Sequence, residues 1–180
     1  MAEGPSPSER VAASYKRLAA SAATLSSASD ELAKSISALD EALKRLNLGV
    51  PAWQEIHGSD NDGSGNFWSR DIGYAKIGGK WGIALRTTEG NHNAPEYDQI
   101  EEWLFNDAPR WLRIDAIDKI PDLIDKLIAA ADETSIKIKQ KTEKAQELAA
   151  ALSQAASDLV QQRRSALAAN VQQRKQGGRS

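Results

Sequence analysis

Residues 72–88 decide the fold, and they read Ile-Gly-Tyr-Ala-Lys-Ile-Gly-Gly-Lys-Trp-Gly-Ile-Ala-Leu-Arg-Thr-Thr. Two alternating runs meet at Gly78-Gly79. A Gly-Gly pair suits the type I′ turn of a β-hairpin, because both central residues of that turn have positive φ. A turn at this point predicts three cross-strand pairs: Lys76 with Trp81, Tyr74 with Ile83, and Ile72 with Leu85.

The two faces of this predicted hairpin differ in side-chain size. One is apolar and reads as a core surface; it carries Ile72, Tyr74, Trp81, Ile83 and Leu85. The other is almost bare backbone, with Asp71 opposite Arg86 at its end. Glycine within a strand indicates that something approaches the backbone closely. Either the protein's own helix covers this face, or it is a docking surface for a protein partner, formed by Gly73, Ala75, Gly82, Ala84 and Arg86.

Large aromatic residues are concentrated in the middle of the 180-residue chain. All five Trp and both Phe lie between positions 53 and 111, and both flanks are rich in Ala, Ser and Leu. Rings build compact cores and small residues let helices approach closely, which predicts a head between two helical arms. Charge is uneven too, with a net −5 over residues 51–120 and +5 over residues 161–180. The absence of Cys excludes disulfides and thiolate chemistry.

The N-terminal flank carries an uninterrupted heptad pattern. Ser6-Pro7-Ser8-Glu9 is a capping box with Pro at the first helical position. Gly49, followed by Pro51, is placed for a left-handed C-cap. Every d position between them is Val or Leu, which predicts a coiled-coil arm over residues 7–48. These d positions are Val11, Leu18, Leu25, Leu32, Leu39 and Leu46.

A weaker heptad pattern in the C-terminal flank predicts a second arm over residues 121–174. Two long amphipathic helices joined by a compact head most simply fold back as an antiparallel pair. This pairing places Leu46 near Pro121. Small residues at several a positions also allow a homo-oligomer through the arms. We expect residues 1–6 and 175–180 to be flexible.

Residues 49–120 form the predicted head. Residues 52–58 and 101–105 read as further strands, which gives a three- or four-stranded antiparallel β-meander. A short helix is expected to cover the apolar side of this sheet with residues at three-residue spacing: Trp111, Ile114 and Ile117. The predicted fold class is therefore α+β, a long antiparallel helical hairpin of coiled-coil arms capped by the meander and its covering helix.

Residues 60–71 follow part of the spacing of a twelve-residue calcium-binding loop, with Asp60 at its first position. Oxygen donors occupy its first, third and fifth positions, a Gly its sixth and an acid its twelfth. The twelfth residue is Asp rather than Glu, the ninth is Trp68, and no helix precedes the loop. We therefore favour a solvated connection rich in turn-forming residues over a metal site. The candidate metal ligands are Asp60, Asp62, Ser64 and Asp71.

Basic residues near the C-terminus offer a contact for nucleic acid phosphates or an acidic protein surface. They are Arg163, Arg164, Arg174, Lys175 and Arg179. Cations are also favoured at a helix C-terminus, so a solvated helix end explains the same pattern. The sequence has no recognisable secretory leader and no apolar run of membrane-spanning length, so we expect a cytoplasmic protein without membrane contact.

The sequence holds no catalytic constellation and no phosphate-binding loop, so we expect neither enzyme activity nor a cofactor. The leading hypothesis is a non-enzymatic interaction or scaffold protein, in which coiled-coil arms present a small β head to a protein partner. One alternative is a nucleic-acid-associated protein that uses the basic C-terminal segment. The other is a small calcium-like metal-binding or enzymatic head, centred on His57, Asp60, Asp62 and His92.

Overall fold

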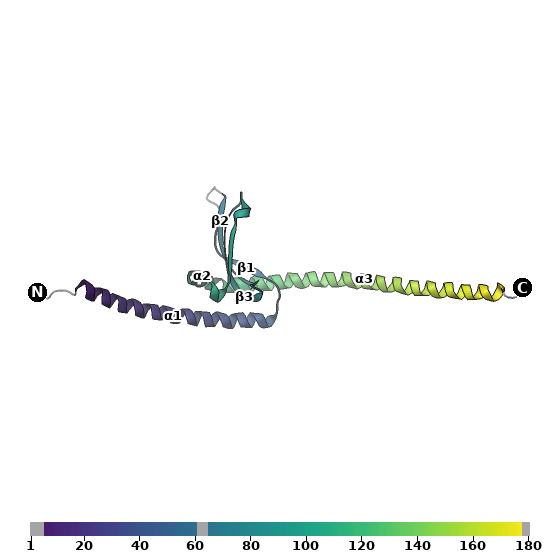
Figure 1. Cartoon of the computed structure of the whole chain (residues 1–180), viewed down its shortest axis with the longest axis horizontal. Helices are drawn as coiled ribbons and strands as arrows, with labels where there is room; N and C mark the ends of the chain where they lie inside the picture. The colour runs from purple at the N-terminus through teal and green to yellow at the C-terminus, as the bar shows by residue number, and fades with distance from the viewer. Residues whose placement is uncertain (1–5, 61–64, 178–180) are drawn as a thin grey trace. The chain divides into compact units, whose positions relative to one another are not determined.

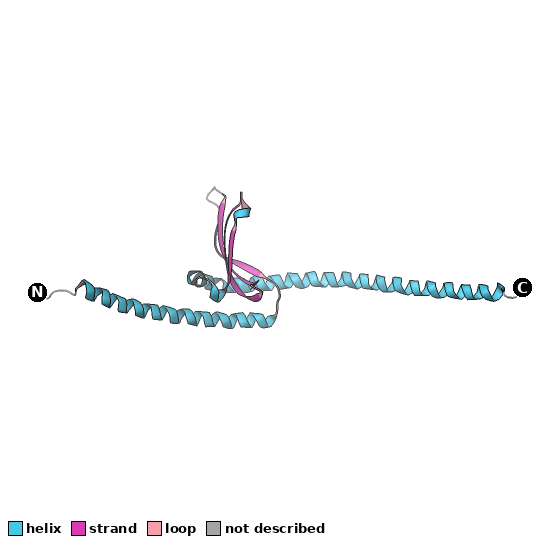
Figure 2. Cartoon of the chain, viewed as in Figure 1, coloured by secondary structure: helices cyan, strands magenta, loops and turns pink. Residues whose placement is uncertain are grey.

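The computed structural model describes residues 6–60 and 65–177 and confirms the α+β class. One four-stranded antiparallel sheet is combined with helices (Figures 1 and 2). The chain divides into two compact units, Met1–Ala131 and Asp132–Ser180. The first unit contains α1 (Pro7–Leu46), the sheet, α2 (Arg110–Ala116) and the first turns of α3 (Ile120–Gly177).

The predicted capping box forms at the start of α1. The hydroxyl of Ser6 accepts a hydrogen bond from the backbone N–H of Glu9, and the Glu9 carboxylate accepts one from the N–H of Ser6. The hydrogen bond that its carboxylate accepts from the Ser6 N–H lowers the pKa of Glu9. The predicted C-cap at Gly49 is wrong by two residues, since Asn47 takes the left-handed conformation with φ 47°. Asn adopts this region more readily than most residues, and its N–H bonds the carbonyl of Lys44.

The central hairpin forms with the predicted register. β2 (Asn66–Ile77) and β3 (Lys80–Asn91) meet at a turn whose two glycines, Gly78 and Gly79, have φ values of 56° and 84°. All three predicted cross-strand pairs are present. β1 (Ala52–Asp60) and β4 (Gln99–Leu104) flank the hairpin in the order β1-β2-β3-β4. The meander is therefore four-stranded.

The hydrophobic core lies on the predicted apolar face of the hairpin, near its turn. Ile72 and Leu85 are completely buried there. Helical side chains complete the cluster: Ile36 from α1, Leu112 and Ala116 from α2, and Leu123 and Leu127 from α3. Tyr74 lies in the same cluster, and its burial, together with the nearby charge of Asp40, raises the pKa of its phenol.

The covering helix forms, but its buried face differs from the predicted one. Leu112 is completely buried, whereas Trp111 and Ile114 are 47% and 56% exposed. Each step of one residue turns a helix face by about 100°. The prediction is therefore wrong for Trp111 and Ile114, whereas Ile117, the third predicted residue, packs partly buried against the core. Trp111 instead lies against Arg70 of β2.

The C-terminal half of α1 packs against the head. Ile36 is buried in the core, and Leu32 and Leu43 pack partly buried against the same cluster. In the N-terminal half of α1, Val11 and Leu18 are more than half exposed. Heptad residues assigned to an arm–arm seam therefore contact the sheet domain in one half of the helix. The antiparallel pairing of the two arms is not confirmed and stays a prediction.

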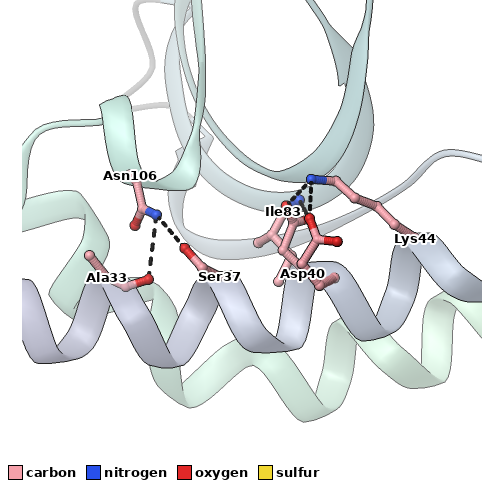
Figure 3. A network of polar contacts seen from close by, with 7 residues as sticks. Ala33, Ser37, Asp40, Lys44, Ile83 and Asn106 are labelled. Carbon is pink, nitrogen blue, oxygen red and sulfur yellow. Dashed lines mark hydrogen bonds and ion pairs between the residues drawn. The ribbon is translucent and has the colours of Figure 1, made fainter.

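Polar side chains also join α1 to the head (Figure 3). The side-chain amide of Asn106 donates hydrogen bonds to the hydroxyl of Ser37 at 3.0 Å and to the carbonyl of Ala33 at 3.4 Å. The Asp40 carboxylate lies 2.7 Å from the Lys44 ammonium, and this contact raises the pKa of Lys44. The Asn106 hydrogen bonds tie the helix to the head, whereas the Asp40–Lys44 pair lies within α1.

Asp40 closes a gap in one edge of the sheet. The hairpin has a two-residue turn, so its hydrogen-bonded pairs alternate from Ile77 and Lys80 onward, and the N–H of Ile83 points away from β2. The ladder with β4 stops at Ala84, so Ile83, the next residue toward the turn, has no partner in β4. The Asp40 carboxylate accepts this N–H at 2.8 Å in place of a strand (Figure 3).

We expect Asp40→Ala to lower the free energy of unfolding by about 1–3 kcal/mol, because it leaves the Ile83 amide without an acceptor. Urea unfolding followed by tryptophan fluorescence measures the loss. Asp40→Asn keeps an acceptor oxygen and is the matched control, with a smaller expected loss. Equal losses in the two variants would contradict the proposed role of the carboxylate as an edge acceptor.

α3 begins at Ile120, one residue before the predicted arm, and runs to Gly177. Among the described residues, no helix has the length and apolar character required to cross a lipid bilayer.

Candidate interaction site

The small-residue face of the hairpin is covered by the protein itself. All four of its small residues are buried: Gly73, Ala75, Gly82 and Ala84. A Cβ on Gly73 would collide with the indole of Trp53, a residue of β1. A Cβ on Gly82 would meet Asp40 of α1 at 3.1 Å and Leu104 of β4 at 3.2 Å. The predicted docking surface is therefore corrected to an internal contact, since the close approach is made by the chain's own side chains.

Arg86, the fifth residue of the predicted docking surface, belongs to an internal network. Its guanidinium donates to the Asp71 carboxylate at 3.2 Å and lies over the Trp53 ring at 4.2 Å from the centroid. The hydroxyl of Ser69 donates to the same carboxylate at 3.1 Å. Asp71 is only 7% exposed. Asp71 is therefore the counter-ion of Arg86. The spacing of residues 60–71 instead placed Asp71 among the candidate calcium ligands.

The candidate calcium ligands are not brought together in the part of the chain that the structure describes. The register places Asp60 opposite Phe67 and Asp71 opposite Glu55, at separate points of the sheet. Asp62 and Ser64 lie outside the described residues. Across residues 6–60 and 65–177, no three His, Cys, Asp or Glu side chains gather in a way that could hold a metal ion.

The two histidines of the enzymatic alternative occupy different places. The Nε2 atom of His92 lies 2.7 Å from a carboxylate oxygen of Asp60, and its ring stacks on Phe67. His57 lies opposite Arg70 in β2, on the other face of the strand from Asp60. Among the described residues of this alternative, Asp60 and His92 are in contact, and His57 lies apart from them. Both partners are more than half exposed, and such surface pairs contribute at most about 1 kcal/mol.

The predicted basic contact lies in the second unit. Arg163 and Arg164 are exposed on α3, which also contains Arg174 and Lys175. Arg179 lies outside the described residues. Contact of this segment with nucleic acid or with an acidic protein stays a prediction.

A groove opens on the core face of the sheet, farther from the Gly-Gly turn than the core itself. Figure 2 shows that this end of the hairpin stands clear of α1. The groove has a volume of about 400 Å³ and is lined from β2, β3, β4 and the start of α2. Three of its lining side chains are indoles: Trp68, Trp103 and Trp111. We call this surface the indole groove.

Arg70 fixes two of the three indoles. Its guanidinium carbon lies 4.9 Å from the ring centroid of Trp68 and 4.4 Å from that of Trp111. Cation–π contacts at exposed sites contribute about 0.5–1 kcal/mol each. The two rings nevertheless remain 37% and 47% exposed. They therefore form an exposed apolar surface that Arg70 holds in place.

Sequence reasoning missed the indole groove, although one signal was present. Trp68 and Arg70 continue the alternation of Ile72 and Tyr74 toward the start of the strand, so all four share one face. The sequence did not show that the covering helix turns Trp111 outward, into the lining of this groove.

Three charged side chains line the groove: the carboxylates of Glu89 and Glu101 and the guanidinium of Arg70. Neither carboxylate forms an ion pair with another described residue. Arg70 already occupies one face of Trp68 and one face of Trp111, so the two carboxylates supply the charge that is complementary to a partner's cation. The groove is thus suited to Lys or Arg side chains of another polypeptide.

No family model, curated protein or solved structure matches the chain, so any proposal about its function rests on this geometry.

Proposed function

We propose that the protein is a non-enzymatic interaction protein whose head binds a partner polypeptide through the indole groove. The observation that carries this proposal is three indoles, two of them more than one-third exposed, beside two carboxylates without a cation partner among the described residues. Tryptophan is enriched among the residues that dominate binding energy, and charges at the edge of an interface select the partner. The expected partner is a polypeptide segment that carries Lys or Arg.

The helical arms are proposed to set the geometry in which the head is presented. Exposed heptad residues in α1 support this part of the proposal, since a and d positions require an apolar partner. Val11, Leu18 and Leu25 are each at least half exposed. The arms would pair with each other as a hairpin or with the arms of a second copy.

Selection of a displayed library of random dodecapeptides on the full-length protein tests the proposal. We expect the enriched peptides to carry Lys or Arg. Trp111→Ala should weaken their binding at least tenfold, about 1.4 kcal/mol, because it removes an indole face from the groove. Isothermal titration calorimetry measures the change.

Tyr97→Ala is the matched control for this experiment. Tyr97 is a 75% exposed aromatic residue that does not line the indole groove. Its removal should leave peptide binding unchanged, and circular dichroism verifies that both variants are folded. The proposal fails when no peptide is enriched, or when the enriched peptides bind Trp111→Ala as tightly as the unaltered protein.

A further inference from the structure

Two edge segments of the sheet carry irregular backbone or side-chain contacts to outward backbone groups. At β3, beyond the end of β4, Asp40 accepts the outward N–H of Ile83. At β1, the Lys126 ammonium donates to the outward carbonyl of Trp53 at 3.2 Å. The β1 register also shifts between Glu55 and His57, and such bulges interrupt strand pairing. Each segment thus has one outward backbone group bound by a side chain, and β1 is also interrupted by its bulge.

The outer edge of β4 is open among the described residues. The N–H groups of Leu85 and Thr87 point toward β4, because they follow the same alternation as Ile83. Their partners Trp103 and Glu101 therefore face β3, and the backbone groups of Ile100 and Glu102 point outward. No described residue hydrogen-bonds the outward N–H and C=O groups of these two residues. Both side chains are exposed, that of Ile100 to 60%.

We infer that the outer edge of β4 binds an extended, basic peptide segment of the partner as a fifth strand of the sheet. Strand addition supplies main-chain hydrogen bonds, while alternate side chains give specificity. One set of peptide side chains would lie beside Glu101 at the end of the indole groove, and the other set beside Ile100 on the opposite face. The inference rests on the proposed function, and it specifies how the partner's backbone is held.

Charge selects the occupant of this edge. Glu101 and Glu102 are adjacent in β4, and only Glu102 has a cation nearby, with Arg86 at 4.0 Å. A second copy of β4 paired antiparallel to the first would bring acidic residues of the two chains together, and like charges across strands are destabilising. A partner strand with Lys or Arg meets the opposite charge. The geometry therefore favours a basic peptide over self-association.

A decapeptide of alternating valine and lysine is the probe for this inference. Titration into ¹⁵N-labelled full-length protein should shift the amide signals of Ile100 and Glu102 and slow the hydrogen exchange of both amides at least tenfold. The corresponding peptide of valine and glutamate should produce neither effect. No response of these two amides at millimolar valine–lysine peptide would overturn the inference.

Ile100→Pro supplies the decisive variant. It removes an outward N–H from an edge strand, a position where proline is tolerated, and it should weaken peptide binding at least tenfold. Ile100→Ala keeps the N–H and is the matched control, with a smaller loss. Methylation of alternate peptide nitrogens tests the same hydrogen bonds without altering the protein, and it should abolish binding in one of the two methylation registers. Full binding by Ile100→Pro or by both methylated peptides overturns strand addition.

Trp111→Ala, measured with the same peptide, separates this inference from the proposed function. Loss of binding in Trp111→Ala but not in Ile100→Pro retains the indole groove and overturns the β4 edge. Loss of peptide binding in Ile100→Pro alone supports the β4 edge as the binding site and overturns a contribution from the indole groove. Unchanged binding in both variants overturns both.

Discussion

Arg86→Met is expected to lower the free energy of unfolding by about 3–5 kcal/mol, because it leaves the Asp71 carboxylate buried without its counter-ion. Methionine retains the length of the side chain and much of its apolar contact with Trp53. The loss is therefore assigned to charge rather than to volume. Urea unfolding followed by circular dichroism measures it.

The double variant Arg86→Met, Asp71→Asn is the control for this prediction. It removes both charges, and the Ser69 hydroxyl retains an oxygen to which it can donate. Replacement of both members of a buried ion pair typically costs much less than removal of one. A double variant no more stable than Arg86→Met would show that the charge on Asp71 is not the source of the loss.

Leu112→Ala is expected to cost about 2–5 kcal/mol of unfolding free energy. Leu112 is completely buried between α2 and the sheet, so its truncation removes apolar contacts and leaves a cavity. Thermal or urea unfolding of the two proteins gives the difference directly.

Ile114→Ala tests the same helix on its other side. Ile114 is 56% exposed, and a substitution at such a position is expected to change stability by about 0.5 kcal/mol or less. The contrast between the two variants measures which face of α2 covers the sheet. A larger loss of unfolding free energy from Ile114→Ala than from Leu112→Ala would contradict this assignment and indicate that Ile114 lies on the buried face.

The indole groove and the β4 edge share one strand, which gives the proposed interaction its geometry. Glu101 and Trp103 line the groove, while Ile100 and Glu102 carry the outward backbone groups. One peptide can therefore meet the edge through its backbone and the groove through its side chains. Mutations on the two sides of β4 separate these contributions.

Local sequence patterns predicted the parts of the fold that depend on neighbouring residues. Gly78-Gly79 fixed the turn and hence the register of β2 and β3, because positive φ at both positions admits few other turns. Ser6 and Glu9 fixed the start of α1 for a similarly local reason, the pairing of the first free N–H groups of a helix. The apolar side of the hairpin followed from strict alternation along the strands.

Tertiary contacts decided what local patterns left open. A heptad residue such as Ile36 satisfies its need for burial equally well in a coiled coil or against a sheet, and here it packs into the sheet core. The small-residue face accommodates either a partner or the chain itself, and the ring of Trp53 covers it. The face of α2 depended on a rotation of one residue that propensity does not set. The sequence thus determined the helices, the strands and the register of the central hairpin. Which apolar surfaces pack against each other, and therefore where the indole groove lies, required the folded chain, because several apolar surfaces could bury the same side chains.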